Sequence, residues 1–215
     1  MEKIIWLCFL LFLVIIGSGC LCLFIVSRQG VIPATGKKPE KKYDAVTFHS
    51  YKPPGGRVPE RGKRVVRAAV DWARHYGCAI VLSVGYTVRN DPRMESEIYA
   101  QYIHENIDGD IPIITGRNGC VRDTAREVKS TFIFCLTMGY KNVCVAGAYP
   151  HLASRIKRYW SRVNKDERLA VTFVGVRVQP RIYLWELAMW LTDVILLPPG
   201  TRRREFFLGL IGRRG

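Results

Sequence analysis

Acidic residues are scarce in this chain of 215 residues, in which 18 Asp and Glu stand against 33 Lys and Arg and give a net charge of +15. Of the charged residues, only Glu2 and Lys3 precede position 28, so the whole excess lies after them. Such an excess favours an anionic partner: a lipid surface, a phosphorylated substrate or nucleic acid. The chain lacks zinc-finger spacing, an RNP-type aromatic pair and a basic-zipper heptad, so we expect no nucleic-acid partner.

The motifs of several common enzyme classes are also missing. There is no Walker-type or GxGxxG run, which excludes the ordinary nucleoside-triphosphate and dinucleotide fingerprints. Four cysteines lie outside the first apolar segment without CxxC spacing, and buried free thiols explain them better than disulfides or a metal site: Cys78, Cys120, Cys135 and Cys144. No Ser-His-Asp, Cys-His or metal-ligand pattern is visible, so we expect no metal, and the sequence indicates neither a cofactor nor a reaction.

Ile4–Val26 is an uninterrupted apolar run, long enough to cross the hydrocarbon core of a membrane as a helix. We therefore predict a single-pass transmembrane anchor over residues 1–27. Lipidation at Cys20, within a stretch similar to a lipoprotein cleavage box, is the alternative. More Lys and Arg residues follow the run than precede it, so the positive-inside rule places the following domain in the cytoplasm.

After the anchor we predict a basic linker over residues 28–42 and one α/β domain over 43–215. The C-terminal part of this domain is an amphipathic, basic tail. Apolar strands without in/out alternation, each followed by a helix, predict an open parallel sheet of about five strands with helices on both faces. The expected strands are Asp44–His49, Ala79–Val84, Ile111–Thr115, Asn142–Gly147 and Leu169–Gly175. The expected helices are Glu60–Tyr76, Glu95–Asn106, Asp123–Met138 and Leu152–Val163.

The tail segment Ile182–Leu197 is apolar nearly all round, except for Glu186 and Asp193 on one face. Two interpretations stay open. The segment packs on the domain, or it lies in the membrane interface through Trp185 and Trp190 with the arginines at 202–204 toward anionic headgroups.

Three loops follow strands at the carboxyl edge of the predicted sheet, where open α/β proteins bind ligands. The first leads to Glu95, Ser96 and Glu97 at the start of a helix. These carboxylates either stabilise the helix dipole or contact a hydroxylated ligand, and Glu97 is a candidate acid or base.

The second and third loops carry cationic and imidazole groups. Arg122, Asp123 and Thr124 stand at the start of a helix, where an arginine and free backbone amides favour an anion. The third loop contains His151, a candidate acid or base, with Arg155 one helical turn further on. We expect these groups and the acidic helix start to line one pocket.

The order of these parts resembles the ElyC/SanA/YdcF family, and most closely its SanA-like, membrane-anchored members. The likeness covers nearly all of residues 43–209 and rests on several stretches in order: DAVTF, Pro59–Ala73, AIVLSVGY, Glu95-Ser96-Glu97, Arg122-Asp123-Thr124, Tyr149/His151/Arg155, and a tail with Glu186, Asp193 and Arg204–Gly209. The family's His-x-x-Arg is His151-x-x-x-Arg155 here, so either the segment gains a residue or the pair is not equivalent.

The resemblance implies a Rossmann-like domain in a bacterial inner-membrane protein that serves envelope barrier and cell-wall precursor homeostasis. It places the domain outside the cytoplasm, against the charge count. The leading hypothesis is a protein that binds membrane lipid and a phosphorylated or nucleotide-like small molecule. One alternative is a non-enzymatic scaffold that binds a partner protein and anionic lipid. A further alternative, from one branch of the family, is binding of S-adenosylmethionine.

Overall fold

The computed structural model describes residues 2–49, 53–82, 92–116, 121, 123–196, 198, 200–204 and 206. Within these residues, six parallel strands form one sheet in the order β1-β6-β5-β2-β3-β4. The strands are β1 (Val31–Pro33), β2 (Ala45–His49), β3 (Ala79–Leu82), β4 (Ile113–Thr115), β5 (Asn142–Ala148) and β6 (Ala170–Val176). The predicted α/β class, with a parallel sheet between helices, is confirmed.

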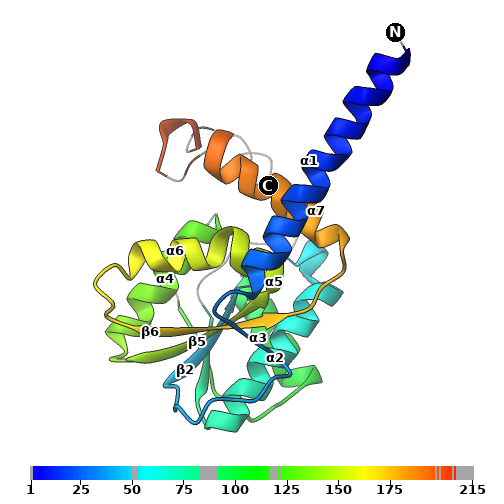
Figure 1. Cartoon of the computed structure of the whole chain (residues 1–215). Coiled ribbons are helices and arrows are strands. Elements are labelled where there is room, and N and C mark those ends of the chain that lie inside the picture. Colours follow the sequence, from blue (N-terminus) through cyan, green and yellow to red (C-terminus); the bar gives the residue numbers. More distant parts are fainter. Residues whose placement is uncertain are drawn as a thin grey trace.

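Helices cover both faces of this sheet (Figure 1). The helices after α1 (Glu2–Arg28) are η1 (Pro54–Gly56), α2 (Glu60–Tyr76), α3 (Glu95–Asn106), α4 (Thr124–Thr137), α5 (Tyr149–His151), η2 (Leu152–Ile156), α6 (Lys157–Val163), α7 (Arg181–Leu191) and η3 (Thr192–Leu196). Along β2, Val46 and Phe48 pack with α2 and α3, whereas Ala45 packs with α4, η2 and α6. This alternation reflects the pleat of a strand that is buried on both faces.

The sixth strand lies in the segment that we predicted as a linker. Val31–Pro33 pairs in parallel with Phe173–Gly175 of β6 at the edge of the sheet. The chain beyond it packs on α2, because Trp72 Nε1 donates to the Ala34 carbonyl at 3.1 Å. The Tyr76 hydroxyl likewise donates to the Pro39 carbonyl at 2.7 Å. A strand this short, ending in proline, has no local signal, since only its pairing with β6 defines it.

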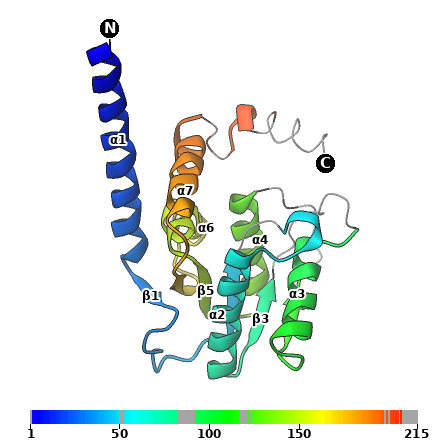
Figure 2. The ribbon, with the colours of Figure 1, turned by 90° about the vertical axis from the view of Figure 1, so that its right-hand side faces the viewer.

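The first helix, α1 (Glu2–Arg28), projects from the α/β unit and carries the N-terminus at its far end (Figures 1 and 2). It is long and apolar enough to cross a membrane. Residues 2–15 are exposed throughout, whereas a stripe from Ile16 to Ser27 is partly or fully buried. Its second half therefore packs on the rest of the chain.

The strand order places a topological switch point between β2 and β5. From β2 the chain runs outward to β3 and β4, and then crosses back to β5 on the other side of β2. The carboxyl ends of the two strands lie side by side, with His49 opposite Gly147. Open α/β sheets bind ligands in the crevice outside such a point, so the residues that follow β2 and β5 are the first to consider.

Candidate functional site

A buried ion pair between Arg155 and Glu186 joins the segment after β5 to α7. Arg155 Nη2 lies 3.2 Å from Glu186 Oε1, and Arg155 Nε donates to Oε2 at 3.3 Å. The Ser154 hydroxyl donates to the same Oε2 at 2.8 Å. Arg155 also donates to Thr124 Oγ1 at the start of α4. Two of the predicted site residues, Thr124 and Arg155, are thereby brought together.

The segment between His151 and Arg155 is not regular α-helix. Arg155 lies in η2, a turn of π-helix between α5 and α6. A π-helical turn accommodates one residue more than an α-helical one and occurs frequently at functional sites.

A second buried pair joins Arg204 to η3 and to the start of α4. Arg204 Nη1 donates to Asp193 Oδ1 at 2.8 Å, and Arg204 Nε lies 3.5 Å from Asp123 Oδ2. The Tyr159 hydroxyl donates to the other Asp193 oxygen at 2.7 Å. Asp123 is also the N-cap of α4, because its Oδ1 accepts from the Arg126 amide. Arg204 therefore points into the protein, not toward solvent or headgroups.

His49 stands at the carboxyl end of β2, beside these pairs. Its Nε2 accepts a hydrogen bond from Trp160 Nε1 at 3.2 Å, and its Nδ1 lies 2.9 Å from Glu127 Oε1. An acceptor role at Nε2 places the proton of the neutral ring at Nδ1, facing the Glu127 carboxylate. The imidazole is fully buried.

His151 is buried as well, directly after β5. Burial, and then the positive charge of Arg155, lowers the pKa of His151 well below 6.5, and Arg61 of α2 adds to the shift. The ring is therefore neutral at neutral pH. Arg61 is close enough to influence it electrostatically, which connects His151 to the open cavity described below.

The acidic start of α3 caps its own helix. Glu97 is exposed, and its Oε2 accepts from the Met94 amide at 2.7 Å, which satisfies one of the free N–H groups at the helix start. Ser96 is buried and Glu95 is partly exposed. The hydrogen bonds described above join Thr124 to Arg155, and Asp123 contacts Arg204 instead. None of these contacts includes the start of α3. Arg122 lies outside the described residues.

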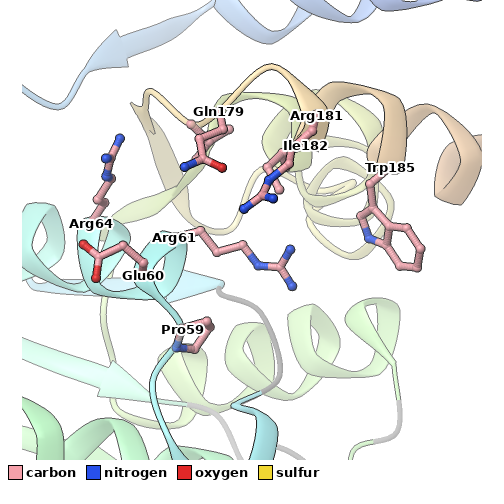
Figure 3. Close-up of a pocket in the computed structure, with 9 residues that line it drawn as sticks. Pro59, Glu60, Arg61, Arg64, Gln179, Arg181, Ile182 and Trp185 are labelled. Carbon is pink, nitrogen blue, oxygen red and sulfur yellow. The ribbon is translucent and has the colours of Figure 1, made fainter.

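An open cavity of about 380 Å³ lies at the same edge, between the start of α2 and the start of α7 (Figure 3). We call it the α2–α7 cavity. Its lining residues are Pro59, Glu60, Arg61, Arg64, Val178, Gln179, Arg181, Ile182 and Trp185. Arg61 and Arg181 extend into it from opposite walls (Figure 3). Three guanidinium groups and two helix N-termini make its potential positive, and among the described lining residues Glu60 is the one carboxylate.

The α2–α7 cavity and the buried pairs share one wall. Ile182 and Trp185 line the cavity, and the next residue, Glu186, holds Arg155. The pair therefore fixes α7, and with it Arg181, relative to the sheet. The sequence analysis did not assign Arg61 and Arg64 to a site. Their position at the start of the helix after β2 was the available signal.

A scan against protein-family models finds no match to this chain, and searches of the curated proteins and of the solved structures find no similar protein.

Proposed function

We propose that this chain is a membrane-anchored protein whose α/β domain binds a phosphorylated or nucleotide-like anion at the carboxyl edge of its sheet. The observation that carries the proposal is the α2–α7 cavity, whose walls present Arg61, Arg64 and Arg181 beside the ends of two helices. Arginine forms paired, charge-assisted hydrogen bonds with phosphate oxygens. A cavity of about 380 Å³ is in the size range of small-molecule sites.

The cavity suits an anion better than the predicted residue set does. Arg155 is paired with Glu186, and Arg204 with Asp193, so these cations are already neutralised by protein carboxylates. Among the described residues that line the cavity, three arginines stand against one carboxylate, that of Glu60. We therefore assign ligand binding to Arg61, Arg64 and Arg181, and a positioning role to Arg155, Asp123 and Thr124.

The membrane anchor in this proposal is α1, whose length and hydropathy suit a single-pass span. The resemblance of the chain to the ElyC/SanA/YdcF family supports a role in bacterial envelope homeostasis. The π-helical turn at Leu152–Ile156 supports the equivalence of His151 and Arg155 with the family's shorter His-x-x-Arg spacing. We propose binding as the function and assign no reaction to the site.

Thermal unfolding of the full chain in detergent micelles tests the proposal against its alternatives. The probes are pyrophosphate, a nucleoside diphosphate and S-adenosylmethionine. We expect the phosphorylated probes to stabilise the protein by about 2.7 kcal/mol at a hundredfold excess over Kd. Stabilisation by S-adenosylmethionine alone would favour that alternative ligand, and stabilisation by none of the probes would favour a scaffold.

Matched arginine variants connect the binding to the cavity. Arg61→Gln and Arg181→Gln remove cations from it, whereas Arg162→Gln removes an exposed cation from α6. The stabilisation by phosphorylated probes should fall in the first two variants and persist in the third. An equal fall in all three would indicate nonspecific screening of the basic surface and would contradict the assignment.

A further inference from the structure

The exposed face of α7 is apolar, which is unusual for a helix at the surface of an α/β domain. Leu184, Trp185 and Leu191 are 50%, 54% and 39% exposed, and Ala188 between them is exposed as well. Arg181 is exposed at the first position of the helix, whereas its other charged residue, Glu186, is fully buried against the domain. A helix that faced water would have the opposite polarity. This face of α7 therefore has the composition of a contact surface.

α7 packs against the second half of α1 (Figure 1). A Cβ atom on Gly19 would lie 2.9 Å from Leu187 Cδ2, so the two helices approach closely there. Further along, the rings of Phe24 and Tyr183 are 5.9 Å apart. Because Gly19 contacts Leu187 while Phe24 contacts Tyr183, the two helices run in opposite directions along this contact.

The position of this contact along α1 fixes the depth of α7. The apolar run of α1 starts at Ile4, and the part before the packed stripe, Ile4–Ile15, rises only about 18 Å. A bilayer has a hydrocarbon core of about 30 Å, so the span must extend to about Leu23 or Phe24. Phe24 then lies at the boundary of the core, and Gly19 lies inside it near that boundary. The helix that packs on them lies at the same depth.

We propose that α7 lies in the lipid–water interface beside α1, with Leu184, Trp185 and Leu191 in contact with acyl chains. The inference rests on the proposed membrane anchoring by α1. Tryptophan is favoured at this depth. The exposed Arg202 and Arg203 follow α7 in the chain and suit anionic headgroups, which favours a lipid surface over a protein partner.

This arrangement explains how α7 satisfies both interpretations left open by its sequence. The side that bears Glu186 packs on the domain through Arg155, and the side that bears Leu184 and Leu191 faces lipid. The pair thus anchors the domain to a helix that is itself held at the membrane surface. The α2–α7 cavity, of which Trp185 is one wall, then opens next to the bilayer.

Site-specific photocrosslinking of the full chain in vesicles of phosphatidylcholine and phosphatidylglycerol tests the inference. A diazirine-bearing phenylalanine analogue replaces one residue at a time: Leu184 or Leu191 on α7, Phe12 on α1, and Arg168 on an exposed loop. Mass spectrometry then identifies each adduct. We expect lipid adducts at Phe12, Leu184 and Leu191 and no lipid adducts at Arg168.

The Phe12 position separates failure of this inference from failure of the anchoring on which it rests. Lipid adducts at Phe12 together with only water or protein adducts at Leu184 and Leu191 would overturn the placement of α7 and leave the anchor standing. A crosslink from Leu184 to a second copy of this chain would likewise show that protein, not lipid, covers α7. Absence of lipid adducts at Phe12 would overturn the anchoring and, with it, the inference.

Discussion

The pair between Arg155 and Glu186 should be a main determinant of how α7 is held on the domain. Glu186 is fully buried and accepts hydrogen bonds from two Arg155 nitrogens and from the Ser154 hydroxyl. In Glu186→Gln the volume is retained, but the buried Arg155 loses its paired carboxylate. Breaking one side of such a pair costs about 3–5 kcal/mol. We expect that loss in the free energy of unfolding.

A double-mutant cycle distinguishes the pair from general packing. Replacement of both partners by apolar residues, as in Arg155→Met with Glu186→Leu, removes both buried charges and should cost much less than the two single changes together. The surface pair between Lys63 and Glu60, at 3.4 Å, is the matched control. Glu60→Gln should change the free energy of unfolding by less than about 1 kcal/mol.

The assay is urea unfolding of the full chain in detergent micelles, monitored by tryptophan fluorescence and by circular dichroism. Additive single changes would show that the two side chains do not interact in the folded protein. A cost for Glu186→Gln no larger than that for Glu60→Gln would refute the reasoning, because it would mean that the Arg155 charge is not buried against Glu186.

Three further predictions concern single residues. The pKa of His151 is lowered below 6.5 by burial, so the unfolded chain takes up a proton at acid pH that the folded chain does not. Its contribution to the free energy of unfolding should therefore fall by up to about 1.4 kcal/mol per pH unit below pH 6.5, and His151→Gln should flatten this slope in urea titrations repeated from neutral to acid pH. Burial raises the pKa of Cys135 to about 12, so alkylation of this thiol by iodoacetamide should require unfolding. Mass spectrometry measures the alkylation, and rapid labelling of the native protein would contradict the buried placement. A Cβ atom at position 175 would lie 2.2 Å from Tyr149 Cε1, so Gly175→Ala should lower the midpoint of thermal unfolding by an amount equivalent to about 1–3 kcal/mol, and an unchanged midpoint would refute the close approach.

The fold was largely accessible from the sequence because its central strands are mostly apolar and show no in/out alternation. The helices Glu60–Tyr76 and Glu95–Asn106 were predicted with the observed limits, since apolar periodicity and Gly77 mark the first and an acidic start marks the second. The Gly77 backbone adopts φ 61°, the left-handed conformation that ends a helix. Local patterns of this kind require no knowledge of distant contacts.

The candidate site was accessible only in part, because its pairs join residues that lie far apart in the chain. Spacing indicated that Glu186 and Asp193 share a helix face, but not that Arg155 and Arg204 would neutralise them. An acidic helix start is explained equally by helix capping and by a ligand contact. The hydrogen bond that Glu97 accepts from the Met94 amide is of the capping kind. The sequence also did not indicate the α2–α7 cavity, since its walls come from the segments after two different strands.

Equilibrium binding of a nucleoside diphosphate to the full chain, measured by isothermal titration calorimetry, decides whether the α2–α7 cavity is a ligand site. We expect one saturable site, at which Arg181→Gln raises Kd about tenfold or more, equivalent to at least 1.4 kcal/mol. Arg162→Gln, on the exposed surface of α6, should leave Kd unchanged. Equal affinity of the wild-type protein and Arg181→Gln, or an equal loss in Arg162→Gln, would contradict the claim that the α2–α7 cavity binds a phosphorylated ligand.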